Sequence, residues 1–303
     1  MTGADLRSAL VDLFWSLWSE LGVPGVVRNH EDCAIDPEPL LLVSPIAFAE
    51  DARLAEQVRA WVRAHGTSIS VSRLRGLAST LDESSRRAFA EFSAGLAQDE
   101  IARWPLWDEQ PPVSWTDVAS PDLPLHRPSL VRFRARAFAG VGARSDILCE
   151  LLASDWMHAS ALAEGSGYTS RQIRQILGEL TAGKITETKE GGPARAFRLA
   201  APEPLEELLR CSGLYWPDWV GIAQLVQLAV ACAALTGSSA RIARVKANSI
   251  RDRAEPLVQR LGLSPLPVTR GAPDAPTALL AWFASWADAL ARGASPCLRR
   301  RRR

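Results

Sequence analysis

Hydroxyl, guanidinium and carboxamide side chains follow one another between residues 169 and 175, where the chain reads Thr-Ser-Arg-Gln-Ile-Arg-Gln. An arginine can donate two hydrogen bonds to the edge of guanine, and a glutamine can form a similar pair of bonds with adenine. Hydroxyl groups and the first amides of a helix bind phosphate. The candidate residues for contact with bases and phosphates are therefore Thr169, Ser170, Arg171, Gln172, Arg174 and Gln175.

A single amphipathic helix over residues 169–181 would place these side chains on one face. Thr169 and Gln172 have the spacing of a capping box, which predicts the helix start. Apolar residues then recur at the i, i+3, i+4 and i+7 positions that form one stripe of a helix, namely Ile173, Ile176, Leu177 and Leu180. We expect this stripe to be buried, the arginines and glutamines to point outward, and Ala182-Gly183 to end the helix.

Two further helices and a hairpin are predicted around this helix. The helices span about 143–153 and 158–164, and Gly165 and Gly167 allow the sharp turn that follows them. Downstream, two short runs within 184–199 flank a Glu-Gly-Gly-Pro tip and predict a β-hairpin. Three of its residues should face the core, Ile185, Phe197 and Leu199, and three should line the hairpin and reach DNA phosphates, Lys189, Arg195 and Arg198.

This order of elements resembles the winged helix-turn-helix domains of bacterial regulators of the ArsR and MarR type. The resemblance covers about 60 residues and implies a recognition helix at 169–181 and a wing at 184–199, with Lys189 and Arg195 as the DNA-contacting residues of the wing. Metal-sensing members of the ArsR type use paired cysteines near these helices. Only Cys149 lies in this segment, so we expect no metal site.

The rest of the chain is predicted to be mainly α-helical. We expect a fold in which N- and C-terminal helical domains flank the winged helix-turn-helix. The expected divisions are an N-terminal helical domain at 1–103, a Pro- and Trp-rich linker at 104–130, the winged helix at 131–200, a C-terminal helical domain at 201–294 and a basic, disordered tail at 295–303.

Charge and motif content limit the classes of function. The net charge is only +1, and it becomes −4 without Arg299 to Arg303, so positive charge for DNA must be local. Residues 130–200 carry ten basic and seven acidic side chains. No phosphate-binding loop, nucleophile elbow or dinucleotide-binding glycine pattern occurs, so we expect no enzyme, no catalytic residue and no cofactor. The polar loop of residues 30–33 contains possible metal ligands, but adjacent residues rarely converge on one ion.

Cysteine usage and hydropathy predict a cytoplasmic protein without a membrane segment. The five cysteines are an odd number and widely spaced, which favours reduced thiols. The apolar run over 220–235 is shorter than the roughly 20 residues of a membrane span.

Two functions remain open. The first is a sequence-specific, double-stranded-DNA-binding transcriptional regulator, a repressor that acts as a homodimer. The alternative is a protein-interaction component, an antitoxin or scaffold of a toxin or phage-defence operon, which grips a protein partner from the same operon and uses its winged helix mainly as structure. Retention on heparin or on random duplex at low salt would distinguish them.

Overall fold

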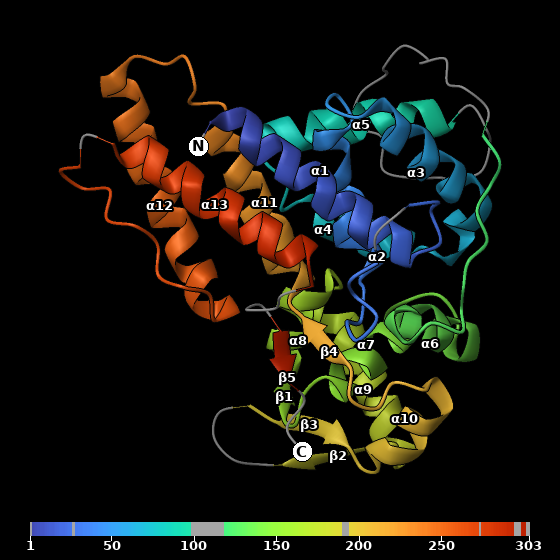
Figure 1. Cartoon of the computed structure of the whole chain (residues 1–303). Helices are drawn as coiled ribbons and strands as arrows, with labels where there is room; N and C mark the ends of the chain where they lie inside the picture. The colour runs from blue at the N-terminus through green and yellow to red at the C-terminus, as the bar shows by residue number, and fades with distance from the viewer. Residues whose placement is uncertain are drawn as a thin grey trace.

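The computed structural model describes residues 2–25, 28–97, 118–189, 194–272 and 274–293, and the backbone of 298–300. For residues 95 and 97 it describes the backbone alone. The described part is mainly helical, with one three-stranded and one two-stranded sheet, both antiparallel. Figure 1 shows an upper body of helices and a lower lobe that contains both sheets.

The upper body is built from both ends of the chain. Its helices are α1 (Gly3–Glu20), α2 (Pro37–Val43), α3 (Ala52–His65), α4 (Val71–Ala78), α5 (Glu83–Ala97), α11 (Trp219–Ala233), α12 (Ala240–Leu261) and α13 (Ala275–Ala291), with the short 3-10 helices η1 (Ser44–Ala47) and η2 (Gly66–Ser68).

The lower lobe comes from the middle of the chain and its last described residues. Its helices are η3 (Pro128–Leu130), α6 (Val131–Ala139), α7 (Ala143–Leu152), α8 (Ala159–Ser166), α9 (Ser170–Ala182) and α10 (Pro202–Leu209). Its strands are β1 (Met157–His158), β2 (Thr186–Lys189), β3 (Ala196–Leu199), β4 (Tyr215–Pro217) and β5 (Leu298–Arg300).

One hydrophobic core unites the helices of the upper body. α1 begins at a capping box formed by Thr2 and Asp5, and its leucines recur every three or four residues, so one face is buried. α1 packs along α13 and also against α11. Trp18 of α1 meets Trp61 of α3 edge to face, with ring centroids 5.3 Å apart. This core therefore combines residues of 1–103 with residues of 201–294, the two segments that the sequence assigns to separate domains.

A second core lies inside the lower lobe. It is formed by the inner faces of α7, α8 and α9 and by β3, and includes Ile147, Leu162, Leu177 and Phe197. The sheet has the strand order β1-β3-β2. Thr186 lies opposite Leu199, and Lys189 lies opposite Ala196. The three helices predicted for this region are confirmed, each with ends within two residues of the prediction.

The prediction for Ile185 is wrong, whereas those for Phe197 and Leu199 are confirmed. Phe197 and Leu199 are buried, but Ile185 is 48% exposed. Lys184 has a positive φ of 57° and turns the chain directly before the strand. Thr186 then takes the inward position, and since neighbouring strand residues point to opposite faces, Ile185 points outward.

For residues 298–300, the second sheet corrects the expectation of a disordered tail. β5 pairs antiparallel with β4, so Leu298 lies opposite Pro217 and Arg300 lies opposite Tyr215. β4 would otherwise present an unpaired strand edge, and β5 supplies backbone partners for it. Trp216 lies in β4, within the segment predicted as a C-terminal helical domain, and α11 starts three residues later under the Asp218 cap.

The proline- and tryptophan-rich linker falls largely outside the described residues. The expectation for Trp104, Trp107 and Trp115 concerns residues that the structure does not describe. Residues 118–130 lie against the upper body, where the carbonyl of Pro121 is 2.7 Å from Nε2 of His65. No helix in the described ranges combines the length and apolar character needed to cross a bilayer.

Candidate nucleic-acid interface

α9 is anchored by a cap at its start and by a buried stripe along its length. The hydroxyl of Thr169 accepts a hydrogen bond from the amide of Gln172 at 3.3 Å. Ile173, Leu177 and Leu180 are buried in the core of the lower lobe. This side of the helix is therefore fixed, and its rotation about its own axis is set by the apolar spacing.

The opposite face of α9 is open to solvent. All six residues predicted to contact DNA from this helix are exposed and lie within its cap and first two turns, namely Thr169, Ser170, Arg171, Gln172, Arg174 and Gln175. Among the described residues, Arg171 and Arg174 form no hydrogen bond or ion pair. Gln175 donates to Glu179 at 3.1 Å. The two guanidinium groups are thus available to an external partner.

Lys189 and Arg195 lie at the loop end of the hairpin formed by β2 and β3. Lys189 ends β2 opposite Ala196, and Arg195 directly precedes that residue, so the two basic residues come from facing ends of the strands. Both are exposed. The predicted tip, residues 190–193, lies outside the described residues.

Arg198, the third residue predicted to line the hairpin, contacts neighbouring side chains of the lobe. Its register partner on the neighbouring strand is Glu187, and the two side chains form an ion pair. Asp155 lies 3.5 Å away on the other side. The guanidinium also lies over the ring of Trp156, 4.6 Å from its centroid. Two carboxylates and an aromatic face therefore compete with DNA phosphate for this half-exposed guanidinium.

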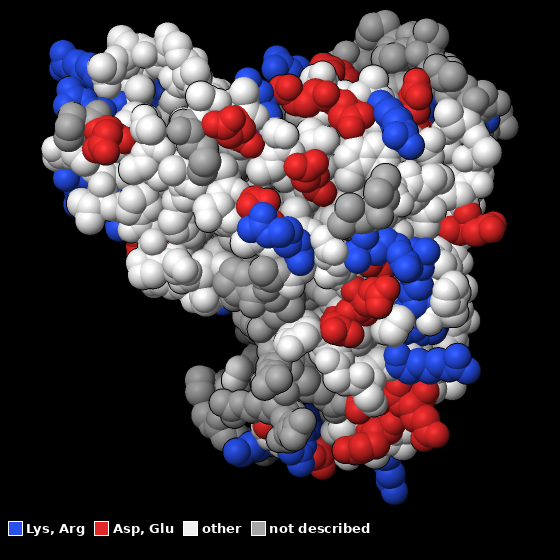
Figure 2. All heavy atoms as spheres, in the orientation of Figure 1, with Lys and Arg blue, Asp and Glu red and all other residues white. Residues whose placement is uncertain are grey.

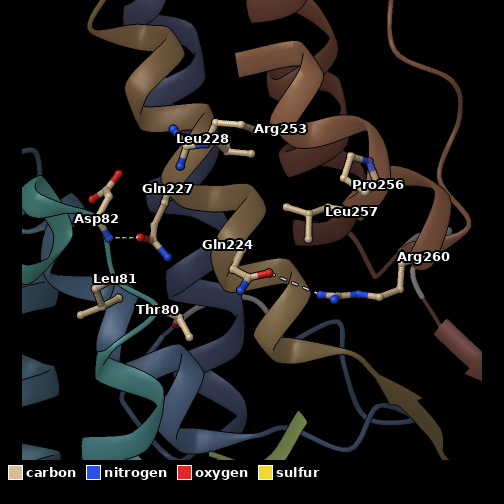
Figure 3. A pocket seen from close by; sticks show the side chains of 10 residues that line it. All are labelled: Thr80, Leu81, Asp82, Gln224, Gln227, Leu228, Arg253, Pro256, Leu257 and Arg260. Carbon is tan, nitrogen blue, oxygen red and sulfur yellow. Dashed lines mark hydrogen bonds between the residues drawn. The ribbon is translucent and has the colours of Figure 1, made fainter. Parts of the chain in front are cut away.

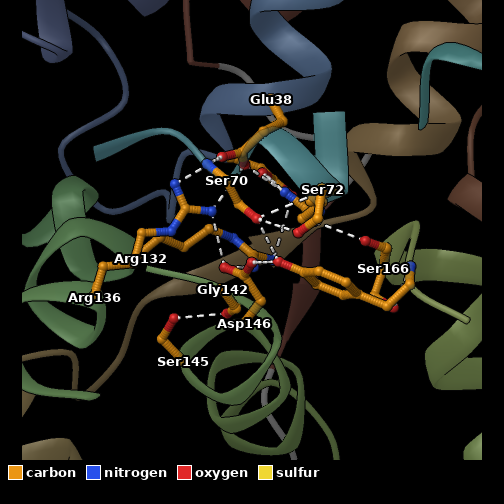
Figure 4. Close-up of polar contacts among 12 residues, drawn as sticks. Glu38, Ser70, Ser72, Arg132, Arg136, Gly142, Ser145, Asp146 and Ser166 are labelled. Carbon is orange, nitrogen blue, oxygen red and sulfur yellow. Dashed lines mark hydrogen bonds and ion pairs between the residues drawn. The ribbon is translucent and has the colours of Figure 1, made fainter. Parts of the chain in front are cut away.

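A cluster of buried charges, absent from the sequence predictions, fastens the lower lobe to the upper body (Figure 4). It consists of three carboxylates and three guanidinium groups, each from a residue that is at most 4% exposed: Asp36, Glu38, Asp146, Arg73, Arg132 and Arg136. We call these six residues the buried ion cluster. Its members come from α4, α6 and α7 and from the start of α2.

Arg132 and Arg136 of α6 form the ion pairs that cross between the two regions, with Asp36 and Glu38 respectively. Within the upper body, Arg73 donates to Glu38 at 2.7 Å and to Asp36 at 2.6 Å. Arg136 of α6 donates to Glu38 at 2.9 Å and to Asp146 of α7 at 2.9 Å. Every carboxylate thus faces at least one guanidinium, as buried charges require.

The positive charges of the cluster hold Asp36 and Asp146 ionised. Burial alone would raise the pKa of Asp36, but the positive charges of Arg132 and Arg73 lower that pKa well below its usual range. Likewise, burial opposes ionisation of Asp146, and Arg136 and Arg73 outweigh it, so its pKa is also lowered. These residues are charged at neutral pH and bind their arginines as full ion pairs.

The cluster also reaches the turn that precedes α9. Arg73 Nε donates to the carbonyl of Ser166, the last residue of α8, at 2.9 Å. Tyr168, two residues farther on, places its hydroxyl 2.7 Å from Ser70 and donates to Asp146 at 2.7 Å. The turn between α8 and α9 is therefore bonded to α4 of the upper body, which fixes where α9 points.

This arrangement changes the charge balance that the sequence suggests for the lobe. Arg132 and Arg136 belong to the ten basic residues of segment 130–200, but they are buried and neutralised. Arg132 and Arg136 are spaced i, i+4 on one helix, and no acid lies near them in the sequence. This spacing was the one signal in the sequence that the two arginines could share a buried acidic partner. Figure 2 shows acidic and basic side chains interspersed on the visible face of the lower lobe.

The described residues hold no group of three or more histidine, cysteine, aspartate and glutamate side chains placed to bind a metal ion. His30, in the loop considered for metal ligands, is 3% exposed and lies 2.9 Å from the hydroxyl of Ser16.

Comparison of the chain with protein-family models, curated proteins and solved structures finds no match. An assignment of function therefore depends on the geometry of the chain itself.

Proposed function

We propose that the lower lobe is a winged helix-turn-helix that binds double-stranded DNA and that the protein is a transcriptional regulator of the repressor type. In support, helices and strands follow the order α7, β1, α8, α9, β2, β3, and β3 lies between β1 and β2 in the sheet. In this assignment α9 is the recognition helix and the β2–β3 hairpin is the wing.

The observation that carries the proposal is the exposed polar face of α9, on which Arg171 and Arg174 have no partner among the described residues. A surface helix that needs only solubility can carry acids and lysines, whereas this one presents two arginines, two glutamines and two hydroxyl residues before its first acid, Glu179. Arginine and glutamine are the side chains that read guanine and adenine in the major groove. Lys189 and Arg195 then bind phosphates on the flanking backbone.

The described cysteines are consistent with the reducing cytoplasm, where such a regulator acts. Cys149, Cys211 and Cys232 are buried, and no disulfide forms among the described cysteines. Burial raises the pKa of the Cys149 thiol to about 12, which keeps it protonated and unreactive.

Selection of duplexes from a random library tests the proposal. The full chain is expected to enrich one sequence motif and to release it steeply as salt rises. Lys189→Ala and Arg195→Ala should weaken binding to every duplex and each reduce the salt slope by about one. Lys246→Ala, a change of an exposed lysine on α12, is the control and should have no effect.

A second function, the protein-interaction component, is favoured by the buried ion cluster. The cluster makes the lower lobe an integral part of the body, as a structural module requires. Under this alternative, the chain would pass through heparin and random duplex at low salt without retention. If a chain without residues 298–303 is still retained, the terminal arginines alone do not cause the retention. That result favours the DNA-binding function.

A further inference from the structure

A cavity of about 580 Å³ lies where α11 and α12 meet the turn between α4 and α5 (Figure 3). Its volume falls in the range of roughly 300–1,000 Å³ that small-molecule sites occupy. It lies in the upper body, apart from the exposed face of α9, so the proposed DNA-binding function gives it no role.

One wall is a single face of α12. Arg253, Pro256, Leu257 and Arg260 have the i, i+3, i+4 and i+7 spacing of a helix, and all four line the cavity. Two arginines thus flank a short apolar surface, and their backbone positions are about 10 Å apart along the helix axis at 1.5 Å per residue. In Figure 3 the side chains of Arg253 and Arg260 both extend from α12 toward α11.

The other walls are polar but neutral at most positions. Gln227 is 4% exposed, and its carbonyl oxygen accepts from the amide of Asp82 at 2.6 Å, which joins α11 to the start of α5. The carboxylate of Asp82 accepts from the amide of Ser85 at 2.8 Å and so is engaged in capping α5. Leu81 and Leu228 complete the apolar lining.

The two arginines differ in their partners. Arg260 pairs with Asp218 at 2.8 Å and donates to Gln224 at 3.4 Å. Within the described ranges, Arg253 has no hydrogen bond or ion pair. Asp218 therefore compensates the charge of Arg260, and among the described residues the guanidinium of Arg253 has no ion-pair partner, although the carboxylate of Asp82 also lines the cavity.

A smaller neighbouring cavity, of about 260 Å³, has a net negative lining. It shares Thr80, Gln224 and Arg260 with the first cavity, but four carboxylates line it, those of Asp36, Glu150, Glu164 and Asp218, against the two guanidinium groups of Arg132 and Arg260. An anion is repelled from that side, so its charged group belongs at the Arg253 end of the larger cavity.

We propose that the larger cavity binds a small organic anion with an apolar body. The anionic group, a carboxylate or a phosphate monoester, binds Arg253, and the apolar body lies over Leu81, Pro256 and Leu257. Gln224 and Gln227 lie on the facing wall of α11. The site is independent of the DNA-binding face.

Calorimetric titration of the full chain tests the site with three probes of equal chain length: octanoate, octyl phosphate and octanamide. We expect saturable binding of at least one anion, and binding of the neutral amide weaker by about tenfold or more. Octanoate against octyl phosphate identifies the anionic group. Equal binding of anion and amide, or no saturable binding of either anion, overturns the proposal.

Variants locate the binding. Arg253→Gln should weaken anion binding about tenfold, Arg253→Lys should retain most of it, and Gln224→Trp should block the cavity. Arg244→Gln, a change of an exposed arginine on α12 that lies outside the cavity lining, is the matched control and should bind as the wild type does. Undiminished binding by Arg253→Gln refutes the assignment, and circular dichroism verifies that each variant is folded.

Discussion

At the scale of single residues, arginines in this chain serve two opposite purposes. Arg73 and Arg136 are buried, and the carboxylates of Glu38 and Asp146 compensate their charges inside the protein. Arg171 on α9 is exposed and has no such partner within the described residues. Only arginines of the second kind can contribute to binding an external anion.

Removal of one charge from the buried ion cluster should be costly. Asp146→Asn leaves three buried guanidinium groups against two carboxylates in the cluster, and an uncompensated buried charge costs about 3–5 kcal/mol. We expect the free energy of unfolding in urea to fall by that amount. The matched control is Glu179→Gln, which breaks an exposed pair with Arg144 and should cost less than about 1 kcal/mol. Equal losses in the two variants would contradict the role given to the cluster.

His30 should make stability depend on pH. Burial lowers the pKa of His30 to about 4 from its usual 6.5, so between these values the unfolded chain binds a proton that the folded chain does not. Stability therefore falls as pH falls from about 6.5 to 4, by up to about 3 kcal/mol. Nearby Glu20 has a pKa raised by burial, which acts in the opposite direction.

A comparison of variants isolates the histidine. His30→Gln retains a polar group near Ser16 but has no proton to bind, and Glu20 is present in both proteins. The loss of stability between pH 6.5 and 4.5, measured by urea unfolding, should be smaller in the variant. An unchanged pH profile would show that His30 is protonated without cost in the folded state.

At the scale of elements, the placement of α9 depends on a close approach between α4 and the turn before it. A Cβ atom added to Gly76 of α4 would lie 1.8 Å from the carbonyl oxygen of Gly167. Gly167 itself has a φ of +73°, a conformation that favours glycine. Backbone meets backbone here, so no flexible side chain can move aside.

Two glycine substitutions should therefore have opposite signs. Gly76→Ala is expected to lower the free energy of unfolding by about 1–3 kcal/mol because the turn must shift. Gly178→Ala, in the middle of α9 with open space around it, should raise that energy by up to about 1 kcal/mol. Both are measured by thermal or urea unfolding. A Gly76→Ala protein as stable as the wild type would mean that α4 does not fix the turn.

Local patterns in the sequence were enough to predict α9, its cap and its exposed face, because these depend on residues within four positions of one another. The ion pair of Arg198 depends on the strand register, which places Glu187 opposite it and which local patterns do not predict. The buried ion cluster joins residues about 100 positions apart, such as Glu38 and Arg136, and no local period reports such a contact. For the same reason β5, which pairs with residues more than 80 positions away, could not be predicted.

At the scale of the whole molecule, the lower lobe exposes apolar side chains beside the proposed DNA-binding module. Phe138 on α6 is 63% exposed, Leu208 on α10 is 55% exposed, and the two helices contact each other. A two-fold dimer through this face would bury Phe138 and Leu208 of both subunits. Dimeric regulators of this type set two recognition helices about 34 Å apart, one turn of DNA.

The dimer is tested by light scattering of the purified chain. The wild type should have twice the monomer mass of 32.9 kDa, and Phe138→Ser/Leu208→Ser should shift it toward the monomer. Ile242→Ser, at an exposed apolar residue of α12, is the control and should remain dimeric. A wild type that is monomeric at all concentrations would exclude this dimer.

Equilibrium binding to a selected duplex and to its scrambled counterpart tests the central claim, that the exposed face of α9 reads DNA sequence. At physiological salt the wild type should prefer the selected duplex by at least about 1,000-fold. Arg171→Ala/Gln175→Ala should lose most of that preference but retain its affinity for the scrambled duplex, and Arg87→Ala, at an exposed arginine on α5, should retain both. A wild type that binds the two duplexes equally, or a double variant that discriminates as well as the wild type, would contradict the assignment.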